Sequence, residues 1–177
     1  MISIFITPTE NPVDLWYGSY MKKLIPLLML LLVIFISSSQ SYEQQTIVPT
    51  LREWFPNEPL RPLLSLFEIP YWGIIVSVDE RGYYYFLEFL IRKAAHFGMF
   101  GLIAITIFIA LPKHKFRLFT AALLTFSLAA LDELHQYFTT GRTATFQDVM
   151  LDTAGAVTFL ILLKFILVLT RRKSVEA

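Results

Sequence analysis

Four long apolar runs constrain this chain more than any other feature of its sequence. A lipid bilayer offers a backbone no hydrogen-bond partners, so a run that crosses it must be helical. Crossing takes about 20 residues, and the shorter runs must therefore be extended by their more polar neighbours. The sequence predicts an all-α integral membrane protein with four transmembrane helices, built around Leu24–Ile36, Ala94–Leu111, Leu118–Leu131 and Thr153–Thr170.

Composition agrees with a membrane protein and excludes several kinds of chemistry. The 177 residues are 55% hydrophobic and 16% charged, which is more apolar than a soluble domain. The absence of cysteine excludes disulfides, thiolate metal sites and thiol nucleophiles. Basic residues form small clusters beside the apolar runs and no continuous stripe, so we expect the lipid bilayer as a partner and no nucleic acid.

The basic clusters predict the orientation, because Lys and Arg in short flanks stay in the cytoplasm. One cluster precedes the first run, one separates the second from the third, and one follows the fourth, so all three fall on one side. We expect a multi-pass protein of the plasma membrane with cytoplasmic N- and C-termini. Arg92 and Lys93 argue weakly for the opposite orientation. The three clusters are Lys22 with Lys23, then Lys113, Lys115 and Arg117, and finally Arg171, Arg172 and Lys173.

The chain divides into five predicted segments. They are a dispensable leader (1–20), the first transmembrane helix (21–39), an outer segment (40–82), a three-helix transmembrane core (83–170) and a cytoplasmic tail (171–177). Met21 followed by two lysines is typical of the start of a membrane protein. The same lysines, the apolar core and Ser37–Ser39 also fit a cleaved signal peptide, so both retention and cleavage of the first helix stay open.

The outer segment contains five prolines, which exclude one continuous helix. We expect short interfacial helices that lie on the membrane. Aromatic side chains of the kind that settle at the headgroup level, among them Trp54, Tyr71, Trp72 and the Tyr83–Phe86 run, would anchor them.

One face of the second predicted transmembrane helix carries ionisable side chains. From about Tyr83 the sequence continues as one helix and places Glu88, Arg92 and His96 at successive steps of four. Glu88 and Arg92 are spaced for an ion pair. His96 enters the membrane region, where an ionisable group needs a polar partner, and both a structural and a functional role stay open.

Further polar residues flank the third and fourth predicted helices. Asp148 and Asp152 lie one turn apart with Gly155 on the same side, where glycine permits close helix packing. Because the loops are short, we expect the polar residues at these helix ends to meet in one pocket. The cluster is either a binding site or a network of ion pairs that fastens the helices, since buried charges must be paired. The candidate site residues are Arg92, Lys93, His96, Asp132, Glu133, His135, Gln136, Arg142, Asp148 and Asp152.

These residues form ordered motifs. The motifs are Arg92-Lys93-x-x-His96-Phe97, then Asp132-Glu133-x-His135-Gln136-x-Phe138, then Gly141-Arg142 and Asp148-Val149-x-x-Asp152-x-x-Gly155, with Ser37-Ser38-Ser39-Gln40 further upstream. Together they resemble the VanZ-like family over roughly Ile91–Leu160. Members of that family often carry asparagine where Asp152 stands and a second glycine where Phe159 stands. The first departure adds a charge, and the second alters helix packing.

The resemblance implies a bacterial envelope protein whose namesake is associated with lower sensitivity to the glycopeptide antibiotic teicoplanin. It carries over no catalytic residue. We expect a protein that binds a lipid-linked cell-wall component or a glycopeptide at the outer membrane face, with Arg92, Lys93 and Arg142 for anionic groups.

Two other functions stay open. The first is a membrane enzyme that acts on a lipid phosphate, with His96 or His135 as general acid or base. The second is an ion or proton pathway, although the inner halves of the helices hold almost no polar residue. Whether the chain is an enzyme is therefore undecided.

We expect no cofactor and no metal. Two histidines and four carboxylates form a ligand set that could suit zinc, manganese or magnesium. Their spacing matches no metal motif, and the arginines and lysine of the same cluster would repel a cation.

Overall fold

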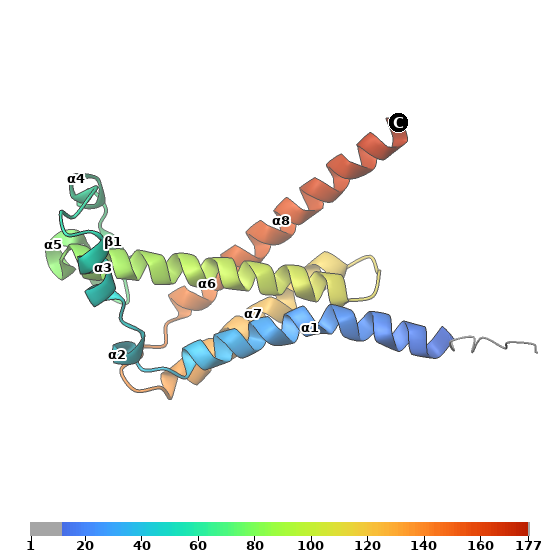
Figure 1. The fold of residues 1–177 in the computed structure, drawn as a ribbon, viewed down its shortest axis with the longest axis horizontal. Helices are drawn as coiled ribbons and strands as arrows, with labels where there is room; N and C mark the ends of the chain where they lie inside the picture. Colours follow the sequence, from blue (N-terminus) through green and yellow to red (C-terminus); the bar gives the residue numbers. More distant parts are fainter. Residues whose placement is uncertain (1–11, 177) are drawn as a thin grey trace, which may run out of the picture.

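The computed structural model describes residues 12–176, and within them it contains eight helices and one two-stranded sheet (Figure 1). Four helices are long and apolar enough to cross a membrane, which confirms the predicted all-α membrane fold. They are α1 (Pro12–Ser38), α6 (Tyr83–Ala110), α7 (Arg117–Tyr137) and α8 (Phe146–Glu176). Residues 1–11 of the predicted leader lie outside the described residues, and α1 already begins within the rest of it.

The connecting segment, residues 39–82, joins α1 to α6 through short elements. They are α2 (Tyr42–Gln45), α3 (Val48–Trp54), α4 (Arg61–Leu64), β1 (Ile69–Tyr71), β2 (Ile74–Val76) and α5 (Val78–Arg81). The short helices agree with the expectation from the prolines. The antiparallel pair of β1 and β2 is a structure that the sequence analysis did not predict.

The hairpin of β1 and β2 turns at Trp72 and Gly73, which both have positive φ values of 52° and 75°. Two consecutive left-handed residues are typical of the tight turn whose twist matches that of paired strands. The hairpin and α5 pack on the first turns of α6 through a buried apolar cluster that includes Val76, Val78 and Phe86. This packing holds Tyr71, at the end of β1, close to α6.

Helix α6 is the centre of the membrane-spanning bundle, because it packs against α1, α7 and α8. Phe100, Ile103 and Ala104, in the middle of α6, are at most 1% exposed and form part of the main apolar core. The first half of the same helix, which carries its charged side chains, is therefore surrounded by the ends of the other three long helices. We call this end of the bundle, where α1 and α7 end and α6 and α8 begin, the polar end.

Helix α8 crosses α6 closely at Gly155 and then diverges from the bundle (Figure 1). A Cβ atom at Gly155 would collide with the backbone carbonyl of Phe97, so this approach requires glycine. The close helix packing at Gly155 agrees with the prediction from the sequence. Phe159 stands one turn further along α8. Its ring lies against Gly101 of α6, where a Cβ would come within 2.5 Å of it. Members of the family often have glycine where Phe159 stands. In this chain the small residue at that contact is Gly101, on the opposite helix.

Candidate functional site

A cavity of about 150 Å³ opens at the polar end between α6, the α7–α8 loop and the connecting segment. We call it the polar pocket. Six of the ten candidate residues line it, namely Arg92, Lys93, His96, Gln136, Arg142 and Asp148. The other four, Asp132, Glu133, His135 and Asp152, lie behind or beside it. Tyr42, Tyr71, Phe89, Gly141 and Thr143 complete the lining.

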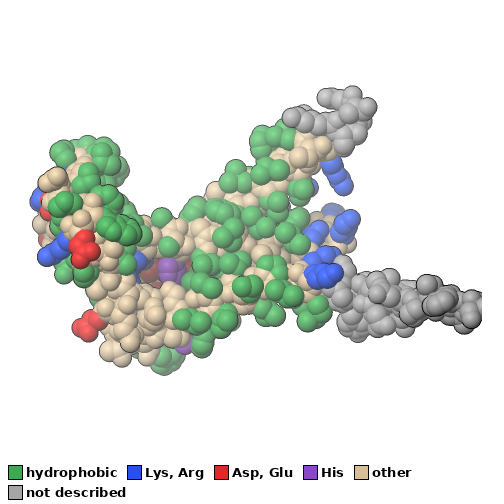
Figure 2. Space-filling model, in the orientation of Figure 1, with side chains coloured by type: hydrophobic (Ala, Val, Ile, Leu, Met, Phe, Trp, Pro, Cys, Tyr) green, Lys and Arg blue, Asp and Glu red, His purple; other side chains and the backbone are tan. Residues whose placement is uncertain are grey.

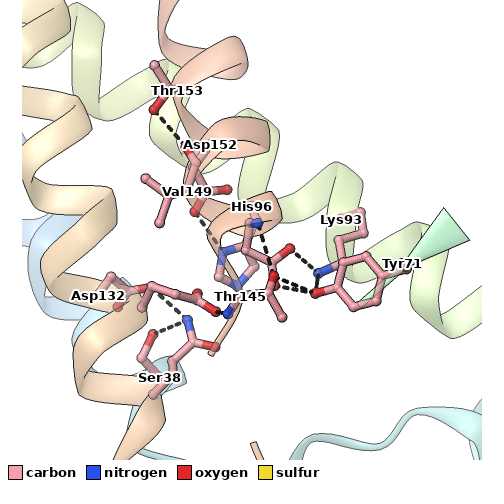
Figure 3. A network of polar contacts seen from close by, with 12 residues as sticks. Ser38, Tyr71, Lys93, His96, Asp132, Thr145, Val149, Asp152 and Thr153 are labelled. Carbon is pink, nitrogen blue, oxygen red and sulfur yellow. Dashed lines mark hydrogen bonds and ion pairs between the residues drawn. The ribbon is translucent and has the colours of Figure 1, made fainter. Parts of the chain in front are cut away.

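Lys93 and Asp148 form an ion pair that joins α6 to the first turn of α8. Tyr71 of β1 donates a hydrogen bond to Asp148 and accepts one from Lys93 Nζ at 2.8 Å (Figure 3). Burial, together with the bond to Asp148, raises the pKa of Tyr71 above its ordinary value, so its hydroxyl remains a donor. Because its charge is balanced internally, Lys93 is poorly placed to hold an external anion.

His96 lines the polar pocket, and its ring points toward the buried carboxylate of Asp152 (Figure 3). Its Nδ1 is 3.5 Å from Oδ2 of Asp152, whose side chain is only 2% exposed. Asparagine is common at this position in the family. The charge that Asp152 adds therefore has a partner, His96. The other ring nitrogen, Nε2, takes no part in this contact, and Asp152 Oδ1 has no hydrogen-bond partner.

Arg92 of α6 and Arg142 of the α7–α8 loop meet at a single acceptor, Gln45 of α2. The Nη1 atoms of Arg92 and Arg142 lie 3.0 Å and 2.9 Å from Gln45 Oε1. Arg92 also forms the predicted ion pair with Glu88, at 3.1 Å. Arg142 forms no ion pair within the part of the chain that the structure describes, and its Nε and Nη2 are buried without hydrogen-bond partners.

Burial, followed by the nearby charge of Arg92, lowers the pKa of Arg142. A guanidinium is protonated at any physiological pH, so this shift reflects the cost of the position and not a loss of charge. The carboxylates of Asp132, Glu133 and Asp148 partly offset this cost from a distance, but Arg142 remains a half-buried cation with no direct ion pair among the described residues.

Glu133 and Asp132 of α7 make contacts behind the polar pocket. Glu133, which is 6% exposed, accepts a hydrogen bond from the backbone N–H of Thr145 and so fixes the loop that leads into α8. Asp132 Oδ2 accepts a hydrogen bond from Gln136 at 2.8 Å, and Gln136 also approaches Ser38 Oγ of α1 at 3.5 Å (Figure 3). These contacts hold α1, α7 and α8 together.

His135 lies on the other side of α7, away from the polar pocket. Its Nε2 is 3.1 Å from Ser39 Oγ, and its ring centroid is 5.0 Å from that of Phe35. Phe35 lies in the last turn of α1 and Ser39 directly follows that helix, so His135 joins α7 to α1. The structure thus separates two histidines that the sequence analysis treated alike.

Gln45 was not among the predicted site residues, and Tyr71 was predicted only as a membrane anchor. Both belong to the connecting segment and reach the polar pocket through its folding. One signal pointed to Gln45, because the whole stretch from Ser37 to Thr46 is polar except for Tyr42. The contacts of Tyr71 depend on the hairpin, which had no comparable signal.

The described residues contain no group of three His, Asp or Glu side chains that could hold a metal ion. The polar pocket is lined by two arginines and a lysine, which disfavour a cation there.

Four membrane-length helices with a polar pocket at one end define a polytopic helical membrane protein. The chain belongs to the VanZ/LLP1 family, whose model matches residues 23–168. The match extends from α1 into α8 and includes every residue of the polar pocket, which confirms the resemblance seen in the motifs. Comparisons with curated proteins and with solved structures gave no match.

Proposed function

We propose that this protein of the cell envelope binds the anionic headgroup of a lipid-linked cell-wall component at the outer membrane face. One observation carries the proposal: Arg92 and Arg142 converge on Gln45, and Arg142 forms no direct ion pair among the described residues, although Asp132, Glu133 and Asp148 act on its charge from further away. A half-buried cation without a partner is costly, and a bound anion would offset that cost. Two adjacent guanidinium groups suit a phosphate, which each can hold through paired hydrogen bonds.

The size of the polar pocket favours a headgroup over a whole glycopeptide. Its volume of about 150 Å³ leaves room for a phosphate group. A glycopeptide antibiotic, with several linked aromatic rings and sugars, is far larger. We therefore infer that any decrease in teicoplanin sensitivity, as the family's namesake suggests, arises through the lipid-linked component and not through direct capture of the drug.

Titration of the purified protein in nanodiscs with a lipid phosphate tests the role of Arg142. We expect Arg142→Ala to weaken binding by about tenfold or more, because a hydrogen bond to a charged group contributes about 1.5–3 kcal/mol. Arg142→Lys keeps the charge but loses the planar fork, so it should also weaken binding. Thermal stability should stay near that of the unmodified protein. Arg52→Ala, which removes an exposed arginine outside the pocket, is the matched control.

A structural role for Arg142 would give a different result. Removal of one partner from a buried ion pair typically costs about 3–5 kcal/mol, which would appear as poor accumulation in the membrane. If both Arg142 variants fail to accumulate, and neutralising Asp148 or Asp132 rescues them, then the cluster fastens the helices and the binding proposal is wrong.

A second function, hydrolysis of the bound lipid phosphate, is favoured by the contact of His96 with Asp152 beside the same pocket. A carboxylate behind an imidazole orients it as a general base. In this reaction His96 would accept a proton from a water whose oxygen bonds to phosphorus, the P–O bond to the lipid would break, and His96 would return the proton to the lipid oxygen that leaves. His135 is less suited, because it contacts Ser39 and Phe35 outside the pocket.

Release of inorganic phosphate from a lipid phosphate checks this second function. We expect His96→Gln to slow release by about a hundredfold or more, since general acid–base catalysis contributes at least that factor. Binding of the lipid phosphate should be nearly unchanged. His135→Gln is the matched control and should retain both properties. If the unmodified protein binds the lipid phosphate but releases no phosphate, it is a binding protein and not a hydrolase.

A further inference from the structure

An apolar groove of about 550 Å³ lies between α1 and α7, beside the polar pocket. Ile34 and Phe100 form its floor and are 8% and 1% exposed. Leu32, Phe35 and Leu131 form its rims and are 56–60% exposed, so the groove opens sideways from the bundle. Its volume is within the range of about 300–1,000 Å³ that is usual for ligand pockets.

Two polar side chains, Asp132 and His135, complete the lining of the groove, and Asp132 connects it to the wall of the polar pocket. Asp132 accepts the hydrogen bond from Gln136, which lines the polar pocket. Phe100 of the groove floor stacks on His96 of the polar pocket, with ring centroids 6.2 Å apart. One layer of side chains therefore separates a groove suited to hydrocarbon from a pocket suited to an anion.

We propose that the groove holds the apolar chain of the same molecule whose phosphate binds in the polar pocket, so that the ligand is a lipid phosphate and not a water-soluble one. This inference rests on the proposed function, because it assumes an anionic headgroup near Arg92 and Arg142. It adds that affinity depends on the apolar chain of the lipid, and that the lipid enters sideways from the bilayer between α1 and α7.

Several contacts favour this route. α1 packs mainly on α6, and at its polar end it is tied to α7 through Ser39 with His135 and Ser38 with Gln136. The open part of the groove lies on the apolar side of these ties, where leucines of α1 and α7 line it. A lipid that enters there keeps its chain in apolar surroundings throughout, and only its headgroup must reach polar groups.

Two probes with the same headgroup test the proposal, dodecyl phosphate and methyl phosphate, titrated against the full chain in neutral-lipid nanodiscs. We expect dodecyl phosphate to bind more tightly by about tenfold or more, because chain burial adds to headgroup binding. Leu131→Trp places a larger side chain across the groove and should remove most of this advantage without changing the affinity for methyl phosphate. Leu134→Trp is the matched control, since Leu134 is on the same helix, is 55% exposed and does not line the groove.

A second matched pair on the opposite rim guards against misfolding of one variant. Leu32→Trp should weaken dodecyl phosphate binding, and Val33→Trp, which is 50% exposed and outside the groove, should not. Equal affinities for the two probes, or equal effects of groove and control variants, would mean that the groove holds ordinary bilayer lipid and would overturn the inference. If Arg142→Ala instead binds both probes as tightly as the unmodified protein does, the proposed headgroup site is wrong.

Discussion

At Gly155, the closest approach of α8 to α6 depends on the absence of a single methyl group. The backbone carbonyl of Phe97 occupies the position that a Cβ would need, and backbone atoms cannot move aside as a flexible side chain can. The ring of Phe159 uses the complementary arrangement, because it covers Gly101 on the opposite helix. Small residues at such crossings let membrane helices gain van der Waals contact, which is a main source of their association.

This geometry predicts unequal effects for two glycine substitutions. Gly155→Ala should lower the free energy of unfolding by about 1–3 kcal/mol, because the helices must separate to admit the methyl group. Gly98→Ala on α6 is the control, since a Cβ there meets no atom within 4 Å. It should leave stability unchanged or slightly improved, as alanine favours a helix more than glycine does. Thermal unfolding in detergent measures both, and equal stability of the two variants would contradict the close crossing.

At the scale of the elements, the long helices could be predicted from the sequence and the hairpin could not. An apolar run of membrane length has one structural solution in lipid, and the start of α6 at Tyr83 agrees with the expectation of one helix from about that residue. The strands β1 and β2 have three residues each, and one contains Pro70, which usually argues against a strand. Their turn is Trp72-Gly73 and lacks the Asn-Gly or Asp-Gly signal of hairpins.

The candidate site was predictable as far as its residues belong to the long helices or to the short α7–α8 loop, which supplies Arg142. Helical spacing placed Arg92 and His96 on one face, and both line the polar pocket. Gln45 reaches Arg142 across 97 positions of sequence, a distance for which local patterns give no rule. His135 and Gln136 are neighbours about 100° apart around α7, so the docking of α1 decides which of them faces the polar pocket.

At the scale of the whole molecule, charge is distributed unevenly between the two ends of the bundle. Figure 2 shows a cluster of Lys and Arg side chains at the end opposite the connecting segment. The loop between α6 and α7 supplies Lys113 and Lys115. Acidic side chains within residues 20–171 lie on the other side, in the connecting segment and at the polar end. Between the ends, exposed apolar side chains cover all four long helices, as lipid contact requires.

This distribution predicts that the polar end lies outside the cytoplasm, because basic residues in short flanks are retained inside. Arg92 and Lys93 argue for the opposite orientation in the sequence, and the structure accounts for their position otherwise. They are held inside the protein by Glu88 and Asp148 and do not lie in a free flank. Reporter fusions check the orientation: fusions after Arg117 and Lys173 should report the cytoplasm, and a fusion near Gly141 should report the outside. A cytoplasmic signal at Gly141 would place the polar pocket on the inner face, where it could not bind a headgroup in the outer leaflet.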